Sequence, residues 1–176
     1  MGIAGGWARA LAAAGVLVGV AALAVSASAQ APAETRQDAL IRGMDQCLAL
    51  RAGADPASYL PGQGFRPGER ADQWGRVVEG DVVQLYIDRT SEPGSIGCSV
   101  ATWPALESDD RLRAAVTQKA ARLELGDRIV REDGGARFET WETTDLNLGV
   151  LRTAPKPEPS MSAIVMIWSE SGTGSR

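Results

Sequence analysis

Apolar and polar residues alternate most clearly within residues 81–103, where Val83, Leu85 and Ile87 are separated by more polar neighbours. A period of two is typical of a β-strand with one buried face. A second segment rich in β-branched residues follows a loop that contains Pro93 and Gly94. Together the two segments and the loop predict a β-hairpin, around which the rest of the chain is organised.

A first amphipathic helix is predicted between residues 35 and 52, where apolar residues recur every three or four positions. Thr35 and Asp38 have the spacing of a capping box, which indicates the start of the helix. Gly53 and Pro56 indicate its end. Its predicted buried stripe consists of Leu40, Ile41, Met44, Cys47 and Leu48.

A second helix is predicted to start at Ser108, because its hydroxyl can cap free amide groups. The negative charges of Asp109 and Asp110 then interact favourably with the positive end of the helix dipole. Gly126 has the position expected of a C-terminal glycine cap. The predicted apolar stripe consists of Leu112, Ala115, Val116, Ala120 and Leu123.

Four more strands are predicted in the second half of the chain. Residues 128–131 and 136–143 flank the tight-turn sequence of residues 132–135, and residues 149–153 and 163–169 follow. The last segment is apolar on both faces, which indicates a central strand covered by a helix on one side.

The predicted fold class is α+β. Residues 57–80 contain several prolines and glycines and show no period, so they are expected to form a long connection. A loop of this length is one candidate place for a ligand surface. The order α-β-β-α-β-β-β-β then implies an antiparallel sheet with two helices packed together on one face.

The first 29 residues have the parts of a secretory signal peptide. Arg9 precedes an unbroken apolar run over residues 10–25, and a small-x-small cleavage motif ends at Ala29. An uncleaved membrane anchor is the alternative, since a span needs about 20 apolar residues. The short, alanine-rich run and the cleavage motif favour removal, which leaves no stable membrane span.

The rest of the chain is expected to be a single periplasmic or secreted domain. Residues 30–34 are a predicted linker, residues 35–168 the α+β domain, and residues 169–176 a disordered tail.

Cys47 and Cys98 are the two cysteines of the chain. In an oxidising compartment an even number of cysteines indicates a disulfide, whereas a redox-active pair would need a spacing such as C-x-x-C. The predicted bond links the first helix to the hairpin. In the chain-entropy model it stabilises the fold by about 4 kcal/mol.

Composition excludes several functions. The net charge is −4 and there is no basic stripe, so neither nucleic acid nor anionic lipid is an expected partner. The chain has no histidine, which removes Ser-His-Asp and Cys-His catalysis and histidine-ligated zinc or haem. No cofactor and no metal are expected.

Carboxylates offer the one catalytic route that remains. Glu139, Glu142 and Asp145 lie close in sequence beside Trp141, and a paired acid and base could cleave a glycosidic bond. Carboxylates this close are more often a solvated edge that prevents strand aggregation. The alternative function is therefore a carboxylate-dependent hydrolase acting on envelope polysaccharide.

Binding is the favoured function. Arg137, Glu139 and Trp141 share one strand face, and an aromatic residue beside an arginine is typical of a recognition patch. We expect these residues on the open face of the sheet, in contact with a protein or a small ligand. The predicted protein is an exported, non-catalytic binding or interaction protein of the cell envelope.

Overall fold

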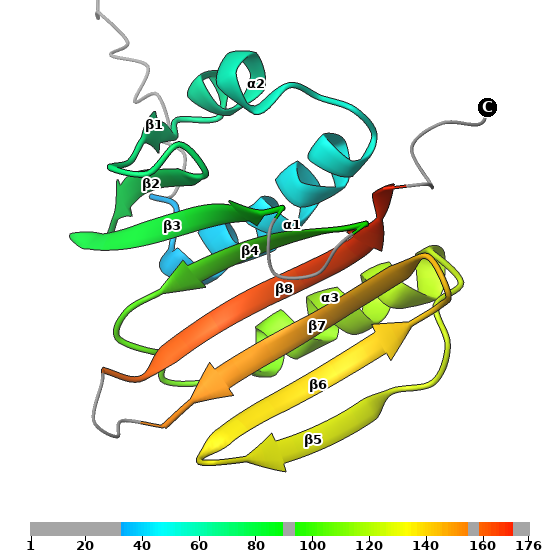
Figure 1. Ribbon diagram of the computed structural model, residues 1–176. Coiled ribbons are helices and arrows are strands. Elements are labelled where there is room, and N and C mark those ends of the chain that lie inside the picture. Colours follow the sequence, from blue (N-terminus) through cyan, green and yellow to red (C-terminus); the bar gives the residue numbers. More distant parts are fainter. Residues whose placement is uncertain (1–32, 90–93, 155–158, 171–176) are drawn as a thin grey trace, which may run out of the picture. The chain divides into compact units, whose positions relative to one another are not determined.

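The computed structural model describes residues 33–89, 94–154 and 159–170 (Figure 1). The predicted signal peptide and most of the predicted tail therefore lie outside the described residues. The elements are α1 (Arg36–Arg51), α2 (Pro56–Gly62), β1 (Arg66–Pro67), β2 (Gln73–Val78), β3 (Asp81–Asp88), β4 (Ser95–Thr102), α3 (Asp110–Arg122), β5 (Ile129–Asp133), β6 (Ala136–Glu142), β7 (Leu146–Thr153) and β8 (Met161–Ser169).

One eight-stranded sheet contains all the described strands, in the order β1-β2-β3-β4-β8-β7-β6-β5. Every neighbouring pair is antiparallel. Figure 1 shows α1 and α3 behind the sheet, where α1 contacts β3, β4 and β8 and α3 contacts β7. The α+β class, the hairpin and the central position of the last strand are confirmed.

The predicted element order differs from the observed one in residues 57–80. This segment was expected to be a connection, but it forms part of α2 together with β1 and β2, so the described residues hold three helices. Asp55 caps α2, and β2 pairs with β3 through a turn in which Glu79 and Gly80 have positive φ. The strand pattern was hidden because Arg76, between Trp74 and Val78, occupies an inward position.

Helix α1 lies directly on β4. The predicted capping box is present, since Thr35 and Asp38 each accept a hydrogen bond from the other's backbone. Gly43 faces Val100 at close range, and one turn later Cys47 is bonded to a cysteine of β4, with a Cα–Cα distance of 5.8 Å. The predicted disulfide is therefore present and fixes α1 to the hairpin.

The start of α3 differs in detail from the prediction. The Ser108 hydroxyl does accept a hydrogen bond from the amide of Asp110, at 3.1 Å. Asp109, however, is 2% exposed, and its carboxylate lies 2.8 Å from Arg152 and accepts a 2.7 Å hydrogen bond from Ser162. Asp109 thus anchors the helix to β7 and β8 and does not serve as a solvated helix-start charge.

The predicted glycine cap of α3 is also wrong. The helix ends at Arg122, and the left-handed residue that follows it is Glu124, with a φ of 54°. Gly126 instead passes close to β6, where an added Cβ would lie 2.9 Å from the carbonyl oxygen of Glu142. This glycine is needed for close backbone approach.

Candidate functional site

The predicted patch of Arg137, Glu139 and Trp141 lies on the helix-covered face, so its expected place on the open face was wrong. Trp141 stands opposite Leu148 and is 6% exposed, and Glu139 is 1% exposed. Alternation correctly predicted that the three side chains share a face. It does not indicate which face, because α3 is far away in the sequence. Ligand binding by these residues stays a prediction.

Glu139 is the centre of an ion-pair cluster. The Nε of Arg137 and the Nε of Arg113 lie 2.9 and 3.2 Å from one carboxylate oxygen, and Arg128 lies 3.5 Å from the other. A buried carboxylate is tolerated when it is paired in this way. The cluster joins α3, which carries Arg113, to β6.

Glu139 and Glu142 do not form a pair, whereas Asp145 lines the same pocket as Glu142, so the hydrolase alternative stays a prediction. Residues of opposite parity on a strand point to opposite faces, so Glu142 lies on the face away from the helices while Glu139 lies beneath α3. Glu142 accepts a 3.1 Å hydrogen bond from Asn147. Two carboxylates on opposite faces of a sheet cannot flank the same glycosidic bond.

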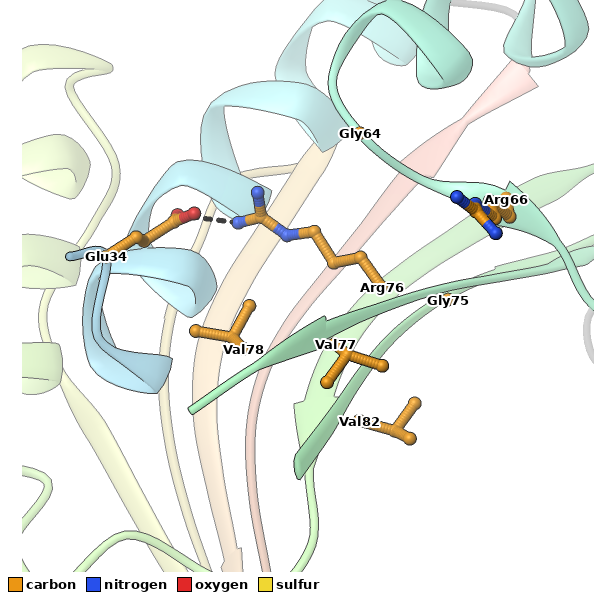
Figure 2. Close-up of a pocket in the computed structure, with 8 residues that line it drawn as sticks. All are labelled: Glu34, Gly64, Arg66, Gly75, Arg76, Val77, Val78 and Val82. Atoms are coloured by element: carbon orange, nitrogen blue, oxygen red, sulfur yellow. Dashed lines mark hydrogen bonds and ion pairs between the residues drawn. The ribbon is translucent and has the colours of Figure 1, made fainter. Parts of the chain in front are cut away.

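A different site is formed at the β2 end of the sheet. A pocket of about 540 Å³ opens there (Figure 2). Its described lining comes from Glu34, two residues before α1, from the segment around β1, and from the strands β2 and β3. The lining residues are Glu34, Gly64, Arg66, Gly75, Arg76, Val77, Val78 and Val82.

Arg76 is the most constrained of these side chains. It is 9% exposed, and Figure 2 shows it extending from β2 toward Glu34, whose carboxylate lies 2.7 Å from its terminal nitrogen. The guanidinium carbon lies 5.0 Å from the centre of the Phe65 ring, and the Nε has no hydrogen-bond partner among the described residues. Burying a guanidinium costs free energy, which the ion pair and the ring contact offset in part.

The pocket is locally basic although the chain is acidic. Glu34 is shared between Arg76 and Arg42, whose Nε lies 3.5 Å from the same oxygen, and Arg66 is exposed on β1. Two arginines share the Glu34 carboxylate and a third, Arg66, lines the pocket, so positive side chains outnumber negative ones here. Such an excess of positive charge attracts anions.

An apolar wall lies beside these charges. Val77 on β2 is 71% exposed and its cross-strand partner Val82 on β3 is 45% exposed. Both valines line the pocket. Exposed aliphatic residues next to arginines can hold a ligand that has both an apolar and an anionic part.

The pocket also meets an open sheet edge. β1 pairs with Trp74 and Gly75 and ends before Val77. On the outer side of β2, the Gln73 carbonyl accepts a 2.7 Å hydrogen bond from Gly68. Because backbone groups alternate along a strand, the N–H and C=O of Val77 point to this same side, beyond the end of β1.

The sequence indicated residues 57–80 as one candidate place for a ligand surface, but it did not reveal the residues that line this pocket. Glu34 falls in the predicted linker and Arg76 in the predicted connection, and the two residues are 42 positions apart. The alternation of Trp74, Arg76 and Val78 was the one local signal for a strand here. Their pairing depends on tertiary structure.

No protein-family model, curated protein or solved structure matches this chain. Within residues 33–89, 94–154 and 159–170, no helix combines the length and apolar character needed to cross a bilayer. The same residues contain no group of three or more acidic or cysteine side chains placed to hold a metal ion.

Proposed function

We propose that the protein is an exported, non-catalytic binding protein of the cell envelope that holds a ligand carrying a carboxylate next to an apolar group. The pocket beside β2 is the proposed site. The observation that carries the proposal is Arg76, a buried guanidinium whose Nε has no partner in the described part of the chain, in a pocket lined by valines, a second arginine and one ion-paired carboxylate.

The chemistry of the lining suits such a ligand. Arginine presents a planar set of donors that matches a carboxylate. The exposed Arg66 and the accessible part of the Arg76 guanidinium would therefore bind the carboxylate of the ligand. Val77 and Val82 would contact the apolar part, and the Val77 amide would donate to a ligand carbonyl. The volume of about 540 Å³ falls within the usual range for small-ligand pockets.

Binding without catalysis fits the described lining. Glu34 is its one carboxylate, and this group is ion-paired to two arginines. Glycoside hydrolysis needs both an acid and a base, and the described lining has one carboxyl group. The chain also has no histidine to take either role.

Export is supported by two features. The disulfide between Cys47 and Cys98 is compatible with an oxidising compartment. The first 29 residues have the pattern of a signal peptide. A periplasmic or secreted location is the simplest one consistent with both.

The test is an NMR titration of ¹⁵N-labelled protein with 4-methylpentanoate, a small branched carboxylate. We expect saturable shifts of the amide signals of Gly64, Gly75 and Val77, because these residues line the pocket. The neutral analogue 4-methylpentanamide is the matched ligand control and should shift them much less. Equal shifts with both compounds, or no saturable shift with the carboxylate, would contradict the proposal.

A pair of variants tests the role of charge. Arg66→Gln removes an exposed pocket arginine and should weaken carboxylate binding about 5- to 10-fold, as expected for the loss of one charged contact. Arg122→Gln removes an exposed arginine of α3 and should leave binding unchanged. The same loss in both variants would indicate general charge attraction and no specific site.

A further inference from the structure

The opposite edge of the sheet is formed by β5, which pairs with β6 on one side and has no described strand on the other. Val130 is 41% exposed, and the three residues that follow it are also exposed. An uncovered strand edge presents unpaired N–H and C=O groups that can pair with another chain.

The turn between β5 and β6 determines which groups are free. Gly134 and Gly135 both have positive φ, as in a two-residue type I′ turn, so the flanking residues Asp133 and Ala136 form a hydrogen-bonded pair. Because hydrogen bonding alternates along the strand, Val130 directs its backbone groups outward.

The same alternation places Glu132 in phase with Val130, so its backbone groups also point outward. Val130 and Glu132 stand opposite Glu139 and Arg137, on the face that carries the helices. Arg128 is the residue before β5, and its side chain lies 3.5 Å from Glu139 on that same face. The side chain of Arg128 is 56% exposed and that of Glu132 is 66% exposed. The outer edge therefore carries, in order, a positive, an apolar and a negative side chain.

We propose that the protein forms a homodimer by antiparallel pairing of β5 with β5 of a second copy, with the two-fold axis at Val130. In this register Val130 faces its own equivalent, and Arg128 faces Glu132 of the second copy on both sides of the axis. Opposite charges and apolar pairs directly across strands stabilise a sheet.

Charge selects both the partner and the register. A two-fold axis at Glu132 would place two carboxylates opposite each other, and an axis at Arg131 would oppose two guanidinium groups. Like charges directly opposite one another are destabilising. In the proposed register the pairing ends after Arg128, because Asp127 would face Asp133 of the second copy. A strand from an unrelated protein would have to supply the same complementary pattern.

The proposed pairs also continue ion pairs that exist within one copy. Arg128 lies 3.5 Å from Glu139, and Glu132 lies 3.3 Å from Arg137. Pairing Arg128 with Glu132 of the second copy would join these contacts into a chain of alternating charges across the axis. Charges arranged in a network contribute more than isolated surface pairs.

Cysteine crosslinking tests the geometry. Directly opposed residues of a hydrogen-bonded antiparallel pair have Cα atoms about 5.5 Å apart, within the disulfide range of about 4.4–6.8 Å. Val130→Cys should therefore give a covalent dimer under mild oxidation, and both native cysteines are already bonded to each other. Val77→Cys is the matched control, because Val77 is 71% exposed at the other edge. Equal crosslinking of both variants would overturn the proposal.

A charge exchange tests the register by sedimentation equilibrium. The edge is short, so we expect a weak wild-type dimer with a Kd of about 0.1–1 mM. Arg128→Glu should raise this Kd about 10-fold, and combining it with Glu132→Arg should restore it to within about 3-fold. If Arg128 acted only through Glu139 within one copy, the second substitution would not restore the Kd of the dimer. A monomeric wild type at about 2 mM, or a double variant no better than the single one, would refute the proposal.

Two controls distinguish a loss of the β5 contact from misfolding of the variant and from a contact at the pocket edge of the sheet. Thermal unfolding monitored by circular dichroism establishes that each variant is folded. Arg66→Gln, at the other edge of the sheet, should leave the Kd of the dimer unchanged. Loss of dimerisation in Arg66→Gln would place the contact at the pocket edge and overturn the assignment to β5.

Discussion

Replacing Gly43 by alanine would measure how closely α1 lies on the sheet. A Cβ at this position would lie 2.6, 2.7 and 2.9 Å from Cγ2, Cγ1 and Cβ of Val100. Val100 is fully buried, at 0% exposed. All three distances are shorter than real Cβ contacts, so the helix, the strand or both must move.

Simple adjustments cannot relieve this overlap. Rotating the Val100 side chain moves the two Cγ atoms but leaves its Cβ in place, 2.9 Å from the new atom. The helix cannot easily lift away either, because Cys47, one turn after Gly43, is bonded to Cys98 on the same strand as Val100. The substitution therefore strains a contact that the disulfide holds closed.

Two opposing terms determine how much Gly43→Ala changes the free energy of unfolding. Overpacking a well-packed core costs about 1–3 kcal/mol. Alanine is favoured over glycine within a helix by about 1 kcal/mol. Because the overlap at Val100 cannot be relieved locally, the upper end of the packing cost applies. We expect Gly43→Ala to lower the free energy of unfolding by about 2 kcal/mol.

Equilibrium unfolding in urea under oxidising conditions measures this change, with Val100→Ala as the background control. Removing the two Val100 methyl groups takes away the two shortest contacts and leaves the Cβ at 2.9 Å. In that background Gly43→Ala should therefore cost clearly less free energy of unfolding than it does in the presence of Val100. Equal stability of Gly43→Ala and wild type in the presence of Val100 would refute the argument.

Three further predictions concern the disulfide, the first helix cap and export. Replacing Cys47 and Cys98 together by alanine should lower the free energy of unfolding by about 4 kcal/mol in urea, and an unchanged midpoint would contradict this. A hydrogen bond from the Thr35 hydroxyl holds the pKa of Asp38 below its usual value, so this stabilisation is present at neutral pH and is lost as the pH falls below about 4. Asp38→Asn should therefore reduce the fall in Tm between pH 5 and pH 2, and an identical pH profile would argue against this role. The intact mass of protein recovered from a host cell envelope should correspond to cleavage after Ala29, whereas a retained leader would indicate a membrane anchor.

Periodicity predicted most of the elements because their apolar faces are continuous. The hairpin alternates without interruption, and the first helix has both a capping box and an apolar stripe that includes Cys47. β2 was missed because Arg76 occupies an inward position that an apolar residue would normally take. Only its partners Glu34 and Phe65, from other segments, explain why a charged side chain is accepted there.

The candidate site was less predictable because it depends on long-range contacts. Alternation correctly grouped Arg137 with Glu139, but the burial of Glu139 depends on α3, which supplies Arg113. Asp109 was assigned to the helix dipole because its partner Arg152 is 43 residues away. Local sequence therefore indicated which side chains share a face, and tertiary structure decided what covers that face.

The position of β8 has a consequence for the order of assembly. Four strands lie on one side of it and three on the other, and β8 forms the ladders to both β4 and β7. Until this strand has been synthesised, the two parts of the sheet have no shared backbone ladder, and each leaves an apolar strand unpaired. Such a topology delays completion of the sheet until residues 161–169 have been synthesised.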